Sequence, residues 1–137
     1  MYLIDTNIFL EVMLSRSRKE ECKQLLRMLR DGKIKGTITD FTIHSIIVLL
    51  DRLNRLKELR TFLKSLSAYK GLYVYVTSIA EELKAIKIAE ETNLDMDDAI
   101  QYSSALSIKA KAIISFDKDF EGLKIPRKEP KDIIKLG

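Results

Sequence analysis

The sequence has little of what would indicate a disulfide, a zinc site or a membrane span. Cys22 is the only cysteine, which excludes an intramolecular disulfide and favours a reducing, cytoplasmic setting in which this thiol simply packs. His44 is the only histidine, so the ligands of a structural zinc site are missing too. The longest apolar run, residues 46–50, is far shorter than the roughly 20 residues of a membrane-spanning helix. We therefore expect no transmembrane segment.

Proline and glycine are also scarce, with 2 and 5 residues in a chain of 137. This length fits a single domain, residues 1–137, and the shortage of helix-interrupting residues predicts few long loops. Hydrophobic residues make up 46% and charged residues 32% of the chain, which is typical of a folded globular protein. The opening residues 1–5 read as a strand and lack the segments of a secretory signal, so we expect none.

Apolar periodicity predicts strands that alternate with helices. The expected strands are residues 2–4, 36–39, 72–76 and 112–116. The expected helices are residues 8–14, 18–31, 43–66 (in one piece or broken near Asn54), one capped by Thr77 or Ser78, and one that begins at 95–98. A loop marked by Pro126 and Pro130 precedes a last strand or helical turn at 131–136. This order predicts a three-layer α/β/α fold with a short, mainly parallel central sheet of four or five strands.

Two of these helices have apolar faces that we expect to point inward. In the helix after Ser78 the face consists of Ile79, Leu83, Ile86 and Ala89. In the helix after residues 95–98 it consists of Ala99, Tyr102, Ala105, Leu106 and Ile108, several of which are small enough to permit close approach to a sheet.

Three aspartates stand where strands end or a helix begins. Asp5 follows the strand at 2–4, Asp117 follows the strand at 112–116, and Asp98 opens a helix. The carboxyl ends of parallel strands share one edge of the sheet, which is where ligands bind in open α/β folds. We therefore expect the three carboxylates to meet and to hold a hard cation, Mg²⁺ or Mn²⁺, in an enzyme.

Each aspartate also has an ordinary structural explanation. Asp5 can cap the helix after it, Asp98 can complement a helix dipole, and Asp117 can close a turn. Taken singly, these explanations account for each residue as well as a catalytic role does. Their joint placement at one sheet edge favours a shared site.

The chain resembles the PIN domain family, and within it the VapC-like toxin ribonucleases of prokaryotic toxin–antitoxin pairs. The resemblance rests on three motifs in order, at residues 2–7, at 97–100 with Ala105 and Leu106, and at 113–120. It covers nearly the whole chain. It implies a PIN-like fold, a Mg²⁺- or Mn²⁺-dependent endoribonuclease acting on RNA, an antitoxin protein as partner, and a homodimer.

The resemblance also implies that Asp5, Asp98 and Asp117 form the acidic centre. Phosphodiester hydrolysis needs an activated water and a stabilised phosphorane, and carboxylate-bound Mg²⁺ contributes to both. We assign Asp5 and Asp98 as the principal metal ligands, and Asp117 to a second metal or to the attacking water. Further residues within the motifs are assigned supporting roles: Asn7, Asp97, Ser115 and Asp119.

One position departs from the family pattern. Family members usually carry a glutamate early in the helix after the second strand, and Ser45 occupies that position here. Asp51 lies six residues further, about 240° around a helix, and should face elsewhere. Asp40, at the exit of the second strand, is the better replacement. Without a replacement, the site has one anion fewer, and a catalytically weakened PIN-like module that binds RNA or protein becomes the alternative function.

The formal net charge of +4 favours a polyanionic partner without requiring one. A candidate phosphate-binding stripe consists of Arg16, Arg18, Lys19, Lys23, Arg27 and Arg30. Glu20, Glu21 and Asp31 interrupt it, which favours an ordinary solvated helix face. His44 could serve as a general base, but no partner is identifiable and its apolar neighbours favour a structural role.

Two further interpretations fit parts of the sequence. The leucine-rich stretch at 46–66 could support dimerisation or antitoxin docking, although ordinary core packing explains it as well. A phosphotransfer receiver also places acids at strand ends. It expects a late lysine, and Lys118 does not map onto that order.

Overall fold

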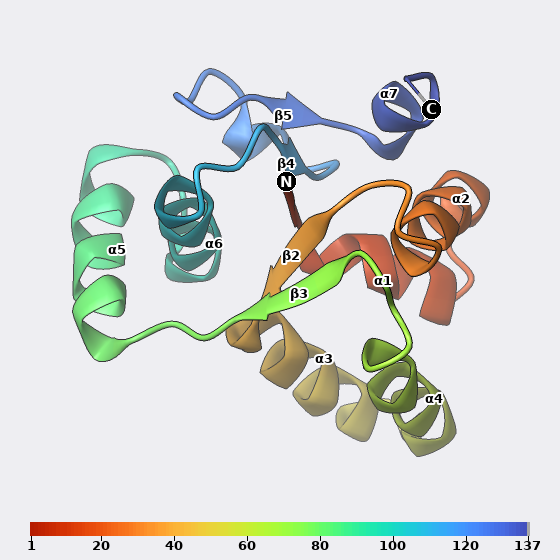
Figure 1. Cartoon of the computed structure of the whole chain (residues 1–137). Coiled ribbons are helices and arrows are strands. Elements are labelled where there is room, and N and C mark those ends of the chain that lie inside the picture. Colours follow the sequence, from red (N-terminus) through yellow and green to blue (C-terminus); the bar gives the residue numbers. More distant parts are fainter. Residues whose placement is uncertain (137) are drawn as a thin grey trace.

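The computed structural model describes residues 1–136, and its centre is a sheet of five strands that pair in parallel. The strands are β1 (Tyr2–Ile4), β2 (Gly36–Thr39), β3 (Leu72–Tyr75), β4 (Ile113–Ile114) and β5 (Arg127–Lys128). Their order across the sheet is β3-β2-β1-β4-β5 (Figure 1). The predicted α/β/α fold class is confirmed. Because β1 lies between β2 and β4, the residues that follow β1 and β4 become neighbours.

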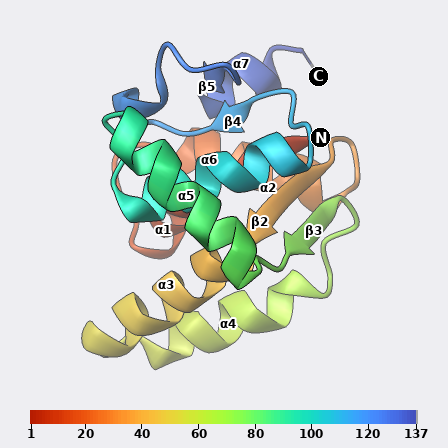
Figure 2. The ribbon, with the colours of Figure 1, turned by 90° about the vertical axis from the view of Figure 1, so that its left-hand side faces the viewer.

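Helices cover both faces of this sheet. They are α1 (Thr6–Met13), α2 (Lys19–Arg30), α3 (Asp40–Arg52), α4 (Leu56–Leu66), α5 (Ile79–Glu91), α6 (Met96–Ser107), the 3₁₀ turn η1 (Lys118–Phe120) and α7 (Pro130–Ile134). Figure 1 shows α5 and α6 on one side of the sheet and α1 and α2 on the other, with the α3–α4 pair below. Figure 2 shows α5 as an outer helix lying over α6.

Alternating side chains of the central strands divide the core in two. Leu3 and Ile113 point toward α6, whereas Ile4 and Ile114 point toward α1 and α2. This alternation follows from the period of two in a strand. Cys22 is fully buried in the part of the core that contains Ile4 and Ile114, as expected for a thiol that packs. Burial of apolar surface on both faces therefore fixes the register of the strands whose ends form the site.

Two local features explain the course of the chain between β2 and β3. Asn54 adopts a left-handed backbone conformation, with φ of 56°, and ends the apolar helical stretch so that α3 and α4 form separate helices. At Gly71, an added Cβ would lie 2.2 Å from the carbonyl oxygen of Ile34. Only glycine permits this close approach, which lets β3 pair with β2.

Three sequence-based expectations are wrong. Ile79 and Leu83 are 78% and 63% exposed, and Ile86 is also exposed, because α6 already covers the sheet and α5 packs on α6 through Ala85. Leu106, expected to face inward, is exposed at the end of α6. The segment between Pro126 and Pro130 is not only loop, since it contains β5. Among the described residues, no helix combines the length and apolar character that crossing a membrane requires.

Candidate metal centre at the sheet edge

Asp5 directly follows β1 and occupies the N-cap position of α1, yet its side chain does not cap that helix. It is only 5% exposed, and its Oδ2 accepts a 2.7 Å hydrogen bond from the hydroxyl of Ser115, the residue after β4. Burial raises the pKa of Asp5 to about 6, although the hydrogen bonds from Ser115 and from the Thr6 backbone oppose this rise. The capping explanation for Asp5 therefore fails.

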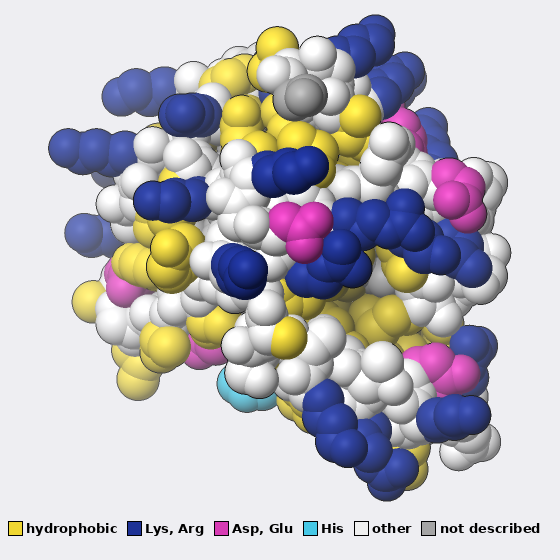
Figure 3. All heavy atoms as spheres, turned by 45° about the vertical axis from the view of Figure 1, so that its right-hand side comes forward, with side chains coloured by type: hydrophobic (Ala, Val, Ile, Leu, Met, Phe, Trp, Pro, Cys, Tyr) yellow, Lys and Arg dark blue, Asp and Glu magenta, His cyan; other side chains and the backbone are white. Residues whose placement is uncertain are grey.

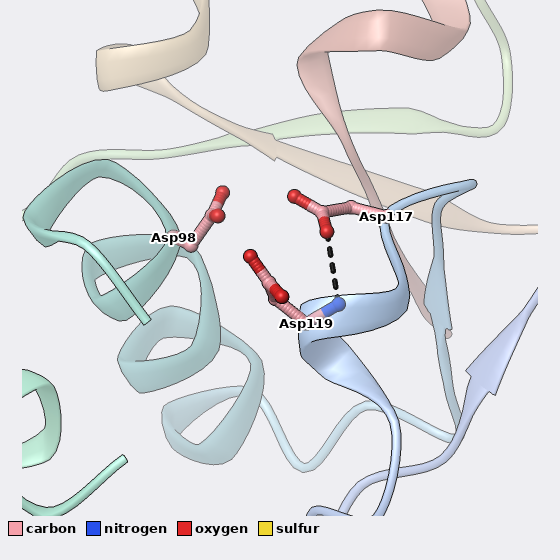
Figure 4. A group of neighbouring side chains, drawn as sticks. All are labelled: Asp98, Asp117 and Asp119. Atoms are coloured by element: carbon pink, nitrogen blue, oxygen red, sulfur yellow. Dashed lines mark hydrogen bonds between the residues drawn. The ribbon is translucent and has the colours of Figure 1, made fainter. Parts of the chain in front are cut away.

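Asp117 lies two residues beyond Ser115 and is connected to the same hydroxyl. The backbone N–H of Asp117 donates to Ser115 Oγ over 3.0 Å. The Asp117 side chain in turn accepts a 2.9 Å hydrogen bond from the backbone N–H of Asp119, within the η1 turn that Asp117 caps. The turn-closing explanation for Asp117 is thus correct, and it leaves the rest of the carboxylate directed at its neighbours (Figure 4).

Asp98 lies in the first turn of α6, the helix on the other side of the sheet from α1. Asp95, not Asp98, caps this helix, because the Asp98 backbone N–H donates to Asp95 Oδ1 over 3.0 Å. The Asp98 side chain is half-buried and points toward Asp117 and Asp119 (Figure 4). Burial, followed by the charges of Asp95, Asp5 and the other aspartates nearby, raises the pKa of Asp98 to about 8.

Asp98, Asp117 and Asp119 each present an oxygen within 4.8 Å of the others (Figure 4). Asp5 lies beside this trio rather than within it, and the charge of Asp117 contributes to its raised pKa. We call these four residues the acidic edge. Closely spaced carboxylates repel one another, and a bound hard cation removes that repulsion. The donor set, all oxygen and anionic, fits Mg²⁺ or Mn²⁺.

The predicted supporting residues occupy different places. Asp97 is exposed on the first turn of α6 beside Asp98, and Asn7 is exposed on the first turn of α1. Asp40 is engaged elsewhere, since its Oδ1 accepts hydrogen bonds from the backbone N–H groups of Phe41 and Thr77 and from the Thr77 hydroxyl. Asp40 therefore joins the start of α3 to the chain before α5 and is not part of the carboxylate trio.

Ser45 and His44 lie on α3 at a hollow of about 410 Å³. The hollow is lined by Phe41, His44, Ser45, Val48, Leu49 and Arg52, with no carboxylate among them. His44 is exposed there and is not hydrogen-bonded to any aspartate among the described residues. At the position where the family has glutamate, the short Ser45 side chain thus leaves a space rather than an anion.

A buried hydroxyl and amide network beneath the site was not anticipated. Gln101 Nε2 donates to Thr42 Oγ1 over 2.6 Å, and the hydroxyls of Thr42 and Thr6 are 2.9 Å apart. Thr39 accepts from the Thr42 backbone N–H as the cap of α3. The sequence signal was Gln101 itself, a polar residue on the inward face of α6, three positions after Asp98. The network connects α1, α3 and α6 where they approach the acidic edge.

Comparison with solved structures gives several chains of the same fold. A toxin–antitoxin complex from Klebsiella pneumoniae has a TM-score of 0.72 at 21% identity, covering 95% of this chain and 98% of that one. VapC20 from Mycobacterium tuberculosis, a sarcin-ricin loop cleaving toxin, has a TM-score of 0.73 at 13% identity, with coverage of 91% and 96%. VapBC2 from Rickettsia felis, bound to a DNA fragment from its promoter, has 0.68 at 14% identity, with coverage of 93% and 97%.

Sequence comparison adds the family. The family described as PIN domain matches residues 2–125, which is most of the chain. A search of curated proteins found no significant match. At the identities given above, the solved structures establish the fold alone.

Proposed function

Because this chain belongs to the PIN domain family, we propose that it is a divalent-metal-dependent endoribonuclease that hydrolyses RNA phosphodiester bonds. The observation that carries the proposal is the trio of carboxylate oxygens from Asp98, Asp117 and Asp119 within 4.8 Å of one another, beside the buried Asp5. Within this trio, burial and the charges of nearby aspartates raise the pKa of Asp98, so a bound cation would favour its ionised form.

The proposed roles follow from position. Asp98, Asp117 and Asp119 would hold the ion, and Asp5, fixed by Ser115, would complete its surroundings directly or through water. A bound Mg²⁺ or Mn²⁺ supplies charge neutralisation at the scissile phosphate and an acidified water. Three of the four residues that would orient the ion are held in place. Asp5 accepts a hydrogen bond from Ser115, Asp117 accepts one from the Asp119 backbone N–H, and Asp98 is half-buried.

We further propose that the protein is the toxin of a toxin–antitoxin pair and works in the cytoplasm with an antitoxin as partner. Among the solved structures of this fold, the one from Klebsiella pneumoniae is a toxin–antitoxin complex, and VapC20 is a toxin that cleaves the sarcin-ricin loop. The lone, buried Cys22 agrees with a reducing compartment. Co-expression with the open reading frame adjacent to its gene tests the pairing, since an antitoxin would relieve growth arrest.

A homodimer is supported by an apolar surface along the sheet edge at β3 and the outer face of α5. Its exposed side chains are Tyr73, Val74, Val76, Ile79, Leu83 and Ile86. β3 is an edge strand, and exposed apolar edges are normally covered in folded proteins. A two-fold contact would let a second copy cover this surface. Sedimentation of the wild type against Leu83→Asp tests it: we expect a dimer for the former and a monomer for the latter.

The second candidate function is a PIN-like module that binds RNA without efficient cleavage. Ser45 is the observation that favours it, because no carboxylate takes its place in the hollow beside α3. Cleavage of an RNA panel with Mg²⁺, with Mn²⁺ and with EDTA separates the two candidates. We expect products only with metal. Binding of the same RNAs without cleavage under either metal would support the second candidate and overturn the first.

A further inference from the structure

The connection between α1 and α2 carries two arginines that reach both strand-end motifs of the acidic edge. We propose that Arg16 and Arg18 bind backbone phosphates of the RNA substrate next to the scissile one. The inference deepens the proposed ribonuclease function and rests on it. The sequence alone favoured a solvated helix face for these residues. Both are exposed, and their contacts with Asn7 and Phe116 are the reason for proposing a further role.

Arg18 is positioned by the motif that ends β4. Its guanidinium carbon lies 4.2 Å from the centre of the Phe116 ring, and Phe116 directly precedes Asp117. Stacking on an aromatic face holds a guanidinium plane in place at little entropic cost, because the planar fork is already rigid. The Arg18 side chain remains 47% exposed. A fixed and exposed guanidinium matches the geometry of a phosphate group.

Arg16 is positioned by the motif that ends β1. Its Nη1 donates to Asn7 Oδ1 over 3.4 Å, and Asn7 lies two residues after Asp5. Both Arg16 and Asn7 are exposed. The connection that carries the two arginines joins α1 to α2, and these helices lie on the side of the sheet opposite α6, the helix that contains Asp98 (Figure 1).

The charge of Arg18 is not cancelled by its ion pair. Arg18 Nη1 is 3.5 Å from Glu129, but the same carboxylate also receives Arg127 at 3.1 Å and Lys131 at 3.9 Å. Arg127 is also paired with Glu121, so in these ion pairs three cations face two carboxylates, which leaves one positive charge in excess. The carboxylates of α6 repel an anionic RNA strand, and the side that carries Arg16 and Arg18 attracts it. The strand would therefore cross the site with its neighbouring phosphates toward the two arginines.

Positive charge continues beyond the two arginines. Figure 3 shows Lys and Arg side chains spread over the side of the molecule that carries α2, α4 and α7, with scattered acidic groups. This wider surface adds non-specific attraction. The contacts with Asn7 and Phe116 distinguish Arg16 and Arg18 from it, and they permit a matched comparison with basic residues at the other end of α2.

RNA binding in a cleavage-blocked background tests the inference. We would measure the affinity of Asp5→Asn protein for a fluorescent single-stranded RNA at several salt concentrations, with and without Arg16→Ala and Arg18→Ala. The double substitution should weaken binding about tenfold or more and reduce the salt slope by about 1.4, since each lost phosphate contact on a single strand contributes about 0.7. Arg16→Lys with Arg18→Lys should restore most of the slope.

The control is Arg27→Ala with Lys33→Ala, which removes the same charge at the far end of α2, where both residues line a separate hollow. We expect it to change affinity less than about twofold. Equal weakening by both pairs, or no weakening by the first pair, overturns the inference. Metal-dependent cleavage by the wild-type protein is measured separately, so that failure of the ribonuclease proposal is distinguished from failure of this one.

Discussion

Ser115 and Asp5 are 110 residues apart in the chain, yet the Ser115 hydroxyl donates a 2.7 Å hydrogen bond to Asp5 Oδ2. The same hydroxyl accepts a hydrogen bond from the backbone N–H of Asp117. A single buried oxygen thus fixes the ends of β1 and β4 relative to each other. The geometry of the acidic edge depends on this connection as much as on the carboxylates.

Asp5→Asn should abolish metal-dependent RNA cleavage, with a loss of about 100-fold or more, because loss of even an outer-shell partner of a metal site costs about 10- to 100-fold. The fold should persist, since an amide of the same shape can still accept from Ser115 and carries no buried charge. Cleavage rate and circular dichroism check both statements. A variant as active as the wild type would remove Asp5 from the mechanism.

Ser115→Ala should lower both stability and cleavage. It leaves the Asp5 carboxylate and the Asp117 N–H without this partner, at a cost of about 1–3 kcal/mol in the free energy of unfolding. Ser104→Ala is the matched control, because Ser104 is equally buried on α6 but donates only to the Ile100 carbonyl of its own helix. Urea unfolding of both variants should show the larger loss for Ser115; equal losses would contradict a special role for this hydroxyl.

Stability without metal should fall as the pH rises from about 4 to 8. The pKa of Asp5 is raised from 3.8 to about 6 and that of Asp98 from 3.8 to about 8, so the folded state binds protons that the unfolded state has released. The free energy of unfolding therefore decreases with pH in this window, by up to about 3 kcal/mol from Asp5. Urea titrations in EDTA measure the decline.

Two comparisons identify its source. Asp5→Asn should make the decline shallower, because the substituted side chain does not titrate, and should leave the part that comes from Asp98. Excess Mg²⁺ should reduce it as well, since the ion binds only the ionised, folded site. A decline of unchanged steepness in Asp5→Asn would assign the pH dependence to other groups.

Ser45→Glu should strengthen metal binding and increase cleavage, because it returns an anion to the position at which the family usually has glutamate. We expect an effect of about tenfold in the metal concentration for half-maximal activity. Ser45→Gln is the control with the same shape and no charge, and it should leave that concentration unchanged. If the two variants need the same metal concentration for half-maximal activity, a charge at position 45 does not affect metal binding.

Thr42→Val should destabilise the protein more than Gln101→Leu does. Thr42 is the shared partner of Thr6, Thr39 and Gln101, so its loss leaves buried polar groups unpaired, at about 1–3 kcal/mol. Gln101 Oε1 already lacks a partner in the described structure, so replacing this amide by leucine removes that unpaired oxygen and should cost less than about 1 kcal/mol. Thermal unfolding would compare them, and the reverse order would contradict the network.

The fold and most of the acidic edge were predictable because strong local rules agree with the tertiary structure. Asp5 and Asp117 follow short apolar strands, and parallel strands bring their carboxyl ends to one edge. The hydrogen bond from Ser115 was not predictable in detail, since a capping role for Asp5 satisfies the same local pattern. Only the packing of β1 against β4 decides between them.

Other features depend on neighbours that a sequence does not reveal. The apolar pattern of α5 indicates a helix with a hydrophobic face, but Ile79 and Leu83 face outward because α6 had already covered the sheet. β5 has two residues, too few for a periodic signal, and exists because β4 offers it an edge. The partners of Asp40 likewise come from Thr77, on a connection remote in sequence.

β1 is the first strand of the chain and β4 its neighbour more than a hundred residues later, so the carboxylates of Asp5 and Asp117 meet only once nearly all of the polypeptide has been made. A chain still emerging from the ribosome holds Asp5 but has no Ser115 to fix it and no Asp117 to join it. A chain that ends before Ser115 therefore has no complete acidic edge, and any chemistry that depends on all four carboxylates requires synthesis to pass Asp119.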